Sequence, residues 1–318
     1  MSVQTVSESE TKECFPCFGG SCVVVVQGSG PAGSPATAAA RARRRLEQWH
    51  HQFSRFEPDS ELSALNRDSR RTVAVSPVMA RFVEAALSAA ARTGGLVDPT
   101  LVGELERAGY GGSLEFEQVP AADPLRRGPA RVPGGPSPEA RWRTVRVDST
   151  AGTVSRVPGV RLDSGGIAKG LFGDILASVL GLHRSFAIAA AGDVRLGGTA
   201  GVPRPIHVES PCDDSVLHTF ELAAGAAATS GISKRSWVDG AGQPAHHLLD
   251  PATGRPAFTG VTQVTALAPT GVEAEALSKA ALLSGPERAS SWLPHGGLIV
   301  YDGGSFDVVE PWGTDLRQ

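Results

Sequence analysis

The amino-acid sequence predicts a mixed α/β fold in which a partly antiparallel sheet is flanked by helices. Two observations carry this prediction. Short apolar segments typical of strands alternate irregularly with helical segments, whereas a parallel sheet requires a regular series of strands and helices. The chain has 318 residues, of which 41% are hydrophobic, so it can build a sizeable core.

The first predicted elements are a strand at 22–27 and a helix from about Thr37 to Gln52, joined by a glycine-rich turn. A second helix is predicted from Pro77 to Arg92. Proline favours the first position of a helix, and the glycines at 94–95 are typical of its end.

The second half of the chain contains the remaining predicted elements. Strand-like segments occur at 142–147 and 153–160, and the chain then enters a helix that ends near Leu180. Further strands are expected at 185–190, 206–209, 263–268 and 298–302, with a helix from about Val272 to Leu283 before the last of them.

These elements are assigned to one main domain, residues 18–303. Residues 1–17 are expected to form a flexible N-terminal segment, and residues 304–318 a C-terminal tail. From Gly111 to Arg141 the chain is rich in proline, glycine and arginine and lacks apolar periodicity, so we expect a long inserted surface loop.

The charge and hydropathy of the sequence argue against some classes of binding partner. Thirty basic and 33 acidic side chains give a formal charge of −3, which offers no general attraction to nucleic acid or to an anionic membrane. The sequence lacks a run of eighteen apolar residues, and its first twenty residues have neither a basic start nor an apolar core. We therefore expect a cytoplasmic protein without membrane contact.

The cysteines Cys14 and Cys17 have the C-x-x-C spacing of a redox or zinc half-motif. Zinc needs four ligands, and no second C-x-x-C or H-x-x-x-H pair follows. Thioredoxin chemistry needs the pair between a strand and a helix. We therefore favour reduced cysteines in a loose segment.

A second tempting motif follows the strand at 22–27. Gly28, Gly30 and Gly33 match the G-x-G-x-x-G fingerprint of a dinucleotide-binding Rossmann fold. However, Pro35 would fall early in the helix, and no apolar strand ending in Asp or Glu appears about twenty residues later. A glycine-rich turn without a ligand is the favoured interpretation.

The stretch 162–170 has the form of a phosphate-binding turn. Gly165 and Gly166 let the backbone approach a ligand, and Lys169 lies in the first turn of a helix. This arrangement offers N–H groups, a positive helix end and an ammonium group to a phosphate. An ordinary glycine turn with a solvated lysine remains the alternative.

A second polar stretch contains His247, which precedes a D-P-x-T-G-x-P turn. A histidine can accept a proton from an attacking hydroxyl near neutral pH. Asp250 or Thr253 can fix the turn through hydrogen bonds from the backbone. The alternative is a solvent-facing histidine beside this turn.

Taken together, the ordered motifs resemble the ApbE-like FAD:protein FMN transferases, and the resemblance runs from about residue 18 to residue 303. The stretches that carry it are 18–21, 53–56, 60–63 with Asn66, 95–100, 162–170 with Asp174, 192–193, 229–231 and 247–254.

This resemblance implies a T-fold-like enzyme that binds FAD in a cleft between two lobes. A hydroxyl of an acceptor protein or small molecule attacks the FMN phosphorus, and AMP leaves. His247 is the implied base, Lys169 stabilises charge, and Asp250 completes the candidate catalytic set. The candidate FAD-binding residues are Asn66, Asp98, Thr100, Gly165, Gly166, Lys169, Asp174, Gly231, Arg235, His247 and Thr253. A homodimer is possible.

The resemblance also implies Mg²⁺ at the pyrophosphate, held by the carbonyl of Gly166 and by an Asp and a Thr on a late helix. Here those two positions hold Glu275 and Lys279. A charged lysine has no lone pair to donate, and its ammonium group repels the ion. Either Lys279 occupies the place of the cation, held by Glu275, or the two form a helix-surface salt bridge in a poor catalyst. In the second case the protein would bind FAD without turnover or act as an FAD diphosphatase.

Overall fold

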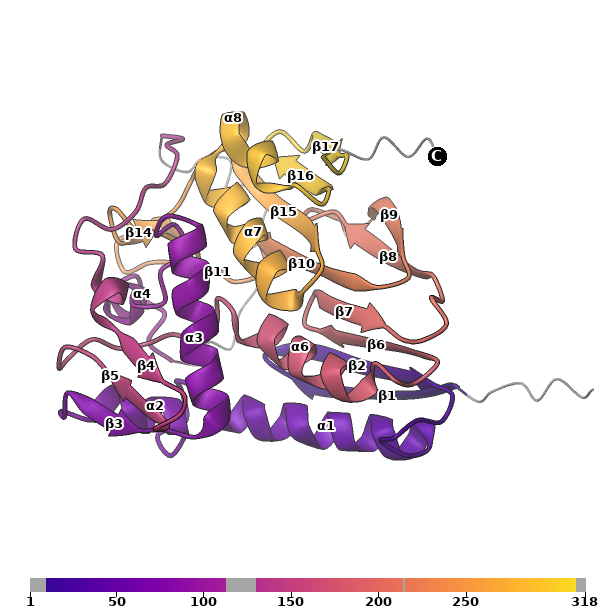
Figure 1. The fold of residues 1–318 in the computed structure, drawn as a ribbon. Helices are drawn as coiled ribbons and strands as arrows, with labels where there is room; N and C mark the ends of the chain where they lie inside the picture. Colours follow the sequence, from indigo (N-terminus) through magenta and orange to yellow (C-terminus); the bar gives the residue numbers. More distant parts are fainter. Residues whose placement is uncertain (1–9, 113–129, 214, 313–318) are drawn as a thin grey trace, which may run out of the picture.

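The computed structural model describes residues 10–112, 130–213 and 215–312 (Figure 1). Its main feature is an eight-stranded sheet in the order β1-β2-β6-β7-β10-β15-β16-β17, and every neighbouring pair is antiparallel. The strands are β1 (Glu10–Cys17), β2 (Gly20–Gln27), β6 (Ser185–Ala190), β7 (Asp193–Gly197), β10 (Gly225–Gly231), β15 (Val261–Ala268), β16 (Gly297–Tyr301) and β17 (Phe306–Val309). The predicted mixed α/β class is confirmed.

Three helices cover one face of this sheet: α1 (Pro35–Gln52), α6 (Ala168–Leu180) and α7 (Gly271–Ser284) (Figure 1). Helix α1 begins at Pro35 because the side chain of Ser34 accepts the N–H of Thr37 at 3.2 Å. Its buried residues recur every three or four positions, at Ala38, Ala42, Leu46 and Trp49. The helix therefore presents one apolar stripe to the strands.

A smaller lobe lies at one end of the main sheet, at the left of Figure 1. It contains a three-stranded antiparallel sheet in the order β3-β5-β4, and α3 of this lobe contacts α6 and α7. Its elements are α2 (Glu61–Arg67), β3 (Thr72–Ala74), α3 (Pro77–Arg92), α4 (Val102–Arg107), β4 (Arg146–Asp148) and β5 (Thr153–Ser155).

The remaining elements are short. Three strand pairs are formed by β8 (Arg204–Glu209) with β9 (Val216–Leu222), β11 (Ser236–Val238) with β12 (Pro244–His246), and β13 (Leu249–Asp250) with β14 (Arg255–Pro256). Helix α8 spans Pro286–Ala289. No helix in the described part of the chain is long and apolar enough to cross a membrane.

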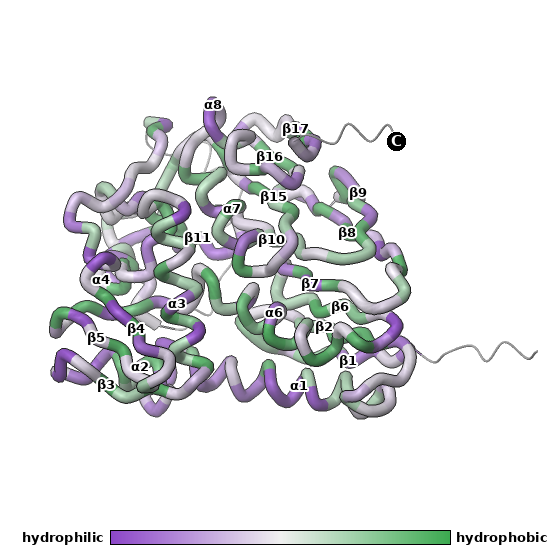
Figure 2. Tube along the Cα trace, viewed as in Figure 1, coloured by the Kyte–Doolittle hydropathy of each residue, from purple (hydrophilic) through white to green (hydrophobic). Residues whose placement is uncertain are grey.

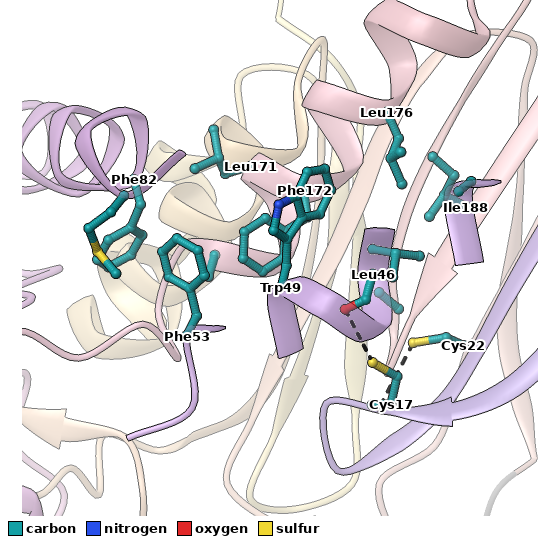
Figure 3. Packing of buried hydrophobic residues seen from close by; sticks show 14 of the residues in the cluster. Cys17, Cys22, Leu46, Trp49, Phe53, Phe82, Leu171, Phe172, Leu176 and Ile188 are labelled. Atoms are coloured by element: carbon teal, nitrogen blue, oxygen red, sulfur yellow. Dashed lines mark hydrogen bonds between the residues drawn. The ribbon is translucent and has the colours of Figure 1, made fainter. Parts of the chain in front are cut away.

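An aromatic cluster joins the two lobes (Figure 3). The ring of Phe172 from α6 stacks on Trp49 with a centroid distance of 5.0 Å and meets Phe53 edge to face at 5.1 Å. Phe53 in turn contacts Phe82 of α3 at 5.4 Å. Helix α6 is mostly apolar in Figure 2, in keeping with its place in this core. The start of α6 is therefore packed between the lobes.

The flexible N-terminal segment predicted for residues 1–17 is wrong for residues 10–17, which form the edge strand β1. Only alternate residues of β1 face the core, so the strand lacks the apolar run that would have revealed it. Cys14 is exposed, Cys17 is buried, and both are free. Residues three apart on a strand point to opposite faces, so β1 does not bring this pair together.

Two other predictions need correction. The C-terminal tail predicted at 304–318 contains strand β17, which pairs with β16. The predicted strand at 142–147 begins as a turn of 3₁₀-helix, Arg141–Thr144, and only its end belongs to β4. In the predicted 111–141 loop, residues 113–129 lie outside the described residues. Its later part is bound to the core, because the N–H of Gly134 donates to the carbonyl of Leu283 at 2.7 Å.

Candidate functional site

A cavity of about 400 Å³ lies between the helices of the main sheet and the loops of the smaller lobe. Its size falls within the range of small-molecule sites. Of the predicted site residues, those that line it are Asp98, Gly165, Gly166, Lys169, Arg235, His247 and Lys279. Segments far apart in sequence thus converge on one space, as the motifs predict.

The wall of this cavity at the start of α6 carries a buried ammonium group. Lys169 Nζ donates to the carboxylate of Asp193 and to Glu275 Oε1, the latter at 3.0 Å. Burial opposes the charged form of Lys169, but the two carboxylates outweigh it and raise the pKa of Lys169 above its ordinary value. Lys169 is therefore a fixed positive charge.

The turn before α6 brings the backbone close to the cavity. The N–H of Gly165 donates to Asp163 Oδ2 at 3.0 Å, and a Cβ added at Gly165 would lie 3.0 Å from the same oxygen. A side chain at position 165 would therefore displace the carboxylate of Asp163. At the cap position of the helix, Ile167 makes no side-chain hydrogen bond.

Glu275 lies at the centre of a charge cluster formed by Lys169, Asp193, Glu275 and Lys279. It is fully buried on α7, and its Oε2 accepts the N–H of Gly170 at 2.9 Å. Its Oε1 lies 3.7 Å from Lys279 Nζ, whose side chain is 13% exposed. The helix-surface salt bridge considered from the sequence is therefore wrong, because Glu275 lies inside the fold and Lys279 lines the cavity.

The cluster does not fit Mg²⁺. Both oxygens of Glu275 face N–H donors, and Asp193 is used by Lys169 and by the N–H of Thr229. Two unit charges about 4 Å apart repel by roughly 4 kcal/mol at an effective dielectric constant near 20, and the ion would carry two charges against the ammonium of Lys279. Within the described ranges, no group of three or more His, Cys, Asp or Glu could hold a metal ion.

His247 supplies a neutral base to the cavity. Burial is the main cause that lowers its pKa well below 6.5, and the charge of Arg235 acts in the same direction. Its Nδ1 is buried, and no hydrogen-bond partner is found for it among the described residues. The backbone N–H of His247 donates to the carbonyl of Arg235 at 3.3 Å. A neutral imidazole with an uncommitted nitrogen can accept a proton.

The cavity lining also includes Arg55, Phe56 and Tyr110, a set of planar groups that was not predicted as part of the site. The guanidinium of Arg55 lies over the rings of Phe56 and Tyr110, at 4.3 and 4.4 Å, and Tyr110 stacks on Trp237 at 5.5 Å. Arg55 is held by Asp163, with its Nε 3.3 Å from Oδ1. Arginine between aromatic rings is a surface that suits a flat ring system. The sequence contained a signal for this surface, because Arg55 lies between Phe53 and Phe56 along the chain.

Asp98 and its neighbour Thr100 form one unit. Asp98 Oδ1 accepts both the hydroxyl and the N–H of Thr100, at 2.5 and 2.8 Å. Asp98 Oδ2 is buried without a hydrogen-bond partner among the described residues, and burial raises the pKa of Asp98. Thr100 does not line the cavity. Asp98 is thus free to bind a donor group of a ligand.

Other predicted residues lie outside the cavity lining, where they support it. Asn66 makes two hydrogen bonds to the backbone of Leu162, at 2.8 and 2.7 Å. Asp174 accepts the N–H groups of Gly271 and Val272 at the start of α7. Gly231 lies at the end of β10.

The turn after His247 is similarly structural. Asp250 Oδ1 accepts the N–H groups of Gly135 and Ala252, and Asp250 Oδ2 accepts the hydroxyl of Thr253 at 2.8 Å. Neither residue lines the cavity. The predicted catalytic role of Asp250 and the predicted FAD-binding role of Thr253 stay predictions. Their hydrogen bonds give both residues a role in positioning the strand that follows His247.

Comparison with known proteins identifies the family. The ApbE family profile matches residues 18–301. A protein of Vibrio cholerae named FAD:protein FMN transferase is 30% identical over 252 residues, covering 77% of this chain and 72% of the relative. A protein of the same name from Escherichia coli K12 is 27% identical over 258 residues, covering 78% and 71%. The crystal structure of the ApbE protein from Thermotoga maritima has a TM-score of 0.75 and 27% identity, covering 98% of this chain and all of that one. This chain belongs to the ApbE family.

Proposed function

We propose that this protein is a flavin transferase, which cleaves FAD and transfers its FMN half to a hydroxyl acceptor with release of AMP. One observation carries the proposal: neutral His247 shares a cavity with the ammonium of Lys169 and the glycine turn at 165–166. The names of the Vibrio and Escherichia relatives support the same reaction.

The transfer requires a base and a positive environment for the pyrophosphate. The hydroxyl oxygen of the acceptor forms a bond to the FMN phosphorus, and its proton passes to His247. The bond from that phosphorus to the bridging oxygen breaks, and AMP leaves with the electron pair. The products are a phosphoester-linked FMN, AMP and one proton, which His247 returns to solvent.

Lys169 contributes by stabilising charge that grows on the phosphate oxygens. Because it is fixed by Asp193 and Glu275, its ammonium needs little reorganisation during the reaction. Arg55 and Tyr110 offer a planar wall to one of the two ring systems of FAD. The magnesium ion implied by the family is left out of this proposal, because the charge cluster does not fit it.

The acceptor is a serine or threonine hydroxyl of a protein, or a hydroxylated small molecule. We place the reaction in the cytoplasm, which expression of a tagged protein and fractionation would test. The possible homodimer stays a prediction that light scattering would check.

The test is incubation of the purified protein with FAD and an excess of threonine-containing peptide, followed by chromatography of AMP, FMN and flavinylated peptide. Equal amounts of AMP and peptide-bound FMN support the transferase. AMP with free FMN would instead assign an FAD diphosphatase. FAD binding without AMP release, for peptide and small-molecule hydroxyls alike, would leave a flavin-binding protein and overturn the proposal.

A further inference from the structure

The ammonium of Lys279 has an unusual setting. Its side chain is 13% exposed, yet among the described residues its Nζ donates no hydrogen bond, and its ion-pair partner Glu275 Oε1 is 3.7 Å away. Its neighbour Lys169, by contrast, contacts both Asp193 and Glu275. Lys279 therefore lines the cavity, and no described residue accepts a hydrogen bond from the N–H groups of its ammonium.

Lys279 also lies beside the phosphate-binding turn. A Cβ added at Gly166 would be 3.9 Å from Lys279 Cε, so the lysine stem passes directly by the glycine backbone. Any phosphate that approaches the Gly165 and Gly166 turn must come near this ammonium. An unsatisfied buried ammonium is costly, and an anion that accepts its hydrogen bonds removes that cost.

The charge balance indicates the same ligand. The cluster of Lys169, Lys279, Glu275 and Asp193 sums to zero formal charge, and Glu275 is shared by both lysines. Asp193 offsets much of the positive charge of Lys169. Glu275 is then the only carboxylate of the cluster that offsets the charge of Lys279. Lys169 and Lys279 line the cavity, whereas Asp193 and Glu275 do not. A pyrophosphate in the cavity would therefore meet the two ammonium groups first, and a divalent cation there would be repelled by them.

We propose that Lys279 binds the FAD pyrophosphate directly and so takes the place of a divalent cation, with Glu275 as the residue that positions its ammonium. This inference rests on the proposed function for the identity of the ligand. It makes the binding of FAD independent of magnesium. Lys279 contacts substrate in this assignment, whereas Glu275 acts only through the two lysines and the N–H of Gly170.

The experiment measures the dissociation constant of FAD by quenching of flavin fluorescence, in EDTA and in excess Mg²⁺. Lys279→Met removes the ammonium and keeps an apolar stem, and Lys279→Arg keeps the charge. The matched control is Lys234→Met, because Lys234 also lies 3.7 Å from a glutamate, Glu209, but is 74% exposed and outside the cavity lining.

We expect wild-type FAD affinity to agree within about twofold in EDTA and Mg²⁺. Lys279→Met should weaken binding by about 10- to 100-fold in both, the factor supplied by one hydrogen bond to a charged group. Lys279→Arg should keep chelator-resistant binding, and Lys234→Met should bind as the wild type does. Circular dichroism checks that Lys279→Met is folded; if it is not, the wild-type and Lys279→Arg comparisons decide.

Two results would overturn the inference. One is FAD binding by the wild type that Mg²⁺ tightens more than tenfold, with one metal ion per chain retained on dialysis. The other is a folded Lys279→Met that binds FAD like the wild type. Either can occur while FMN transfer proceeds, which leaves the proposed function standing. Conversely, chelator-resistant binding that depends on Lys279, without FMN transfer to any acceptor, would support the inference and sink the proposed function.

Discussion

The backbones of Gly170 and Gly271 touch where α6 and α7 meet. A Cβ added at Gly170 would lie 2.4 Å from the carbonyl carbon of Gly271, and one added at Gly271 would lie 2.6 Å from the carbonyl oxygen of Gly170. This contact brings Glu275 of α7 within hydrogen-bonding distance of the N–H of Gly170. The charge cluster of the cavity therefore depends on two residues without side chains.

Gly170→Ala should consequently lower the free energy of unfolding by about 1–3 kcal/mol or more, because the new methyl group meets rigid backbone. The control is Gly103→Ala in α4, where a Cβ meets only the end of the Arg161 side chain at 3.5 Å. Alanine favours the helix, so this control should be neutral or slightly stabilising. Urea unfolding followed by circular dichroism measures both, and equal midpoints would contradict so close a crossing.

Asp174 gives α7 its cap from another helix. It accepts the N–H of Gly271 at 2.8 Å and that of Val272 at 3.1 Å, and it pairs with Arg195 at 2.9 Å. Asp174→Ala should lower the free energy of unfolding by roughly 1–3 kcal/mol. Thr270→Ala removes the helix's own, longer cap bond to Glu273 at 3.3 Å and should cost less, about 1 kcal/mol. The reverse order in thermal unfolding would mean that Asp174 is not the main cap.

Sequence reasoning singled out some of the residues that line the cavity, because glycine turns and polar motifs are local signals. The glycines at 165–166 drew attention to Lys169 in the first turn of the following helix, and the turn after His247 drew attention to that histidine. The antiparallel order of the main sheet could not be predicted, since strand pairing joins segments far apart in the chain. β2, for example, pairs with β6 some 160 residues later.

Pairwise contacts across the cavity were also beyond the sequence. Nothing local indicates that Asp193 meets Lys169, because the two residues lie 24 positions apart on different elements. A signal for the burial of Glu275 was present but was missed, since helix α7 has small and apolar residues on nearly all its faces. From the sequence alone, Glu275 is interpreted as an ordinary i, i+4 ion-pair partner of Lys279. Its true partners come from α6, through the contact between Gly170 and Gly271.

The pH dependence of catalysis should follow His247. Its folded pKa lies below 6.5, so the neutral base dominates at pH 6.5 and is lost only as pH falls further. We expect kcat/KM to be constant through pH 6.5 and to fall at lower pH, since this ratio reports the free enzyme. His247→Gln should reduce the rate by about 10²- to 10⁴-fold.

A substitution of Arg235 tests why the pKa of His247 is lowered. Its charge lowers the pKa of His247, after burial itself, so Arg235→Gln should move the acid limb of kcat/KM to higher pH. A loss of packing alone would lower the rate without moving the limb. An acid limb centred at or above pH 6.5 in the wild type would exclude His247 as the base described here.

His246 should make the fold sensitive to acid. It is fully buried, packs edge to face on Phe258 at 4.9 Å, and neither ring nitrogen has a partner among the described residues. Burial lowers its pKa from 6.5 to about 3. Between these values the unfolded chain binds a proton that the folded chain does not, so stability is full above pH 6.5 and declines as pH falls toward 3.

The slope of that decline is up to about 1.4 kcal/mol per pH unit for one histidine. In His246→Leu this contribution disappears, so its free energy of unfolding should fall less steeply from pH 6.5 to 4 than that of the wild type. Measurements at pH 8, where His246 is neutral in both states, isolate the change in packing. Because leucine binds no proton in the unfolded chain, the stability of the variant should rise relative to that of the wild type as pH falls from 6.5 to 4. Parallel stability curves for the two proteins would mean that His246 is protonated, or reached by water, in the folded state.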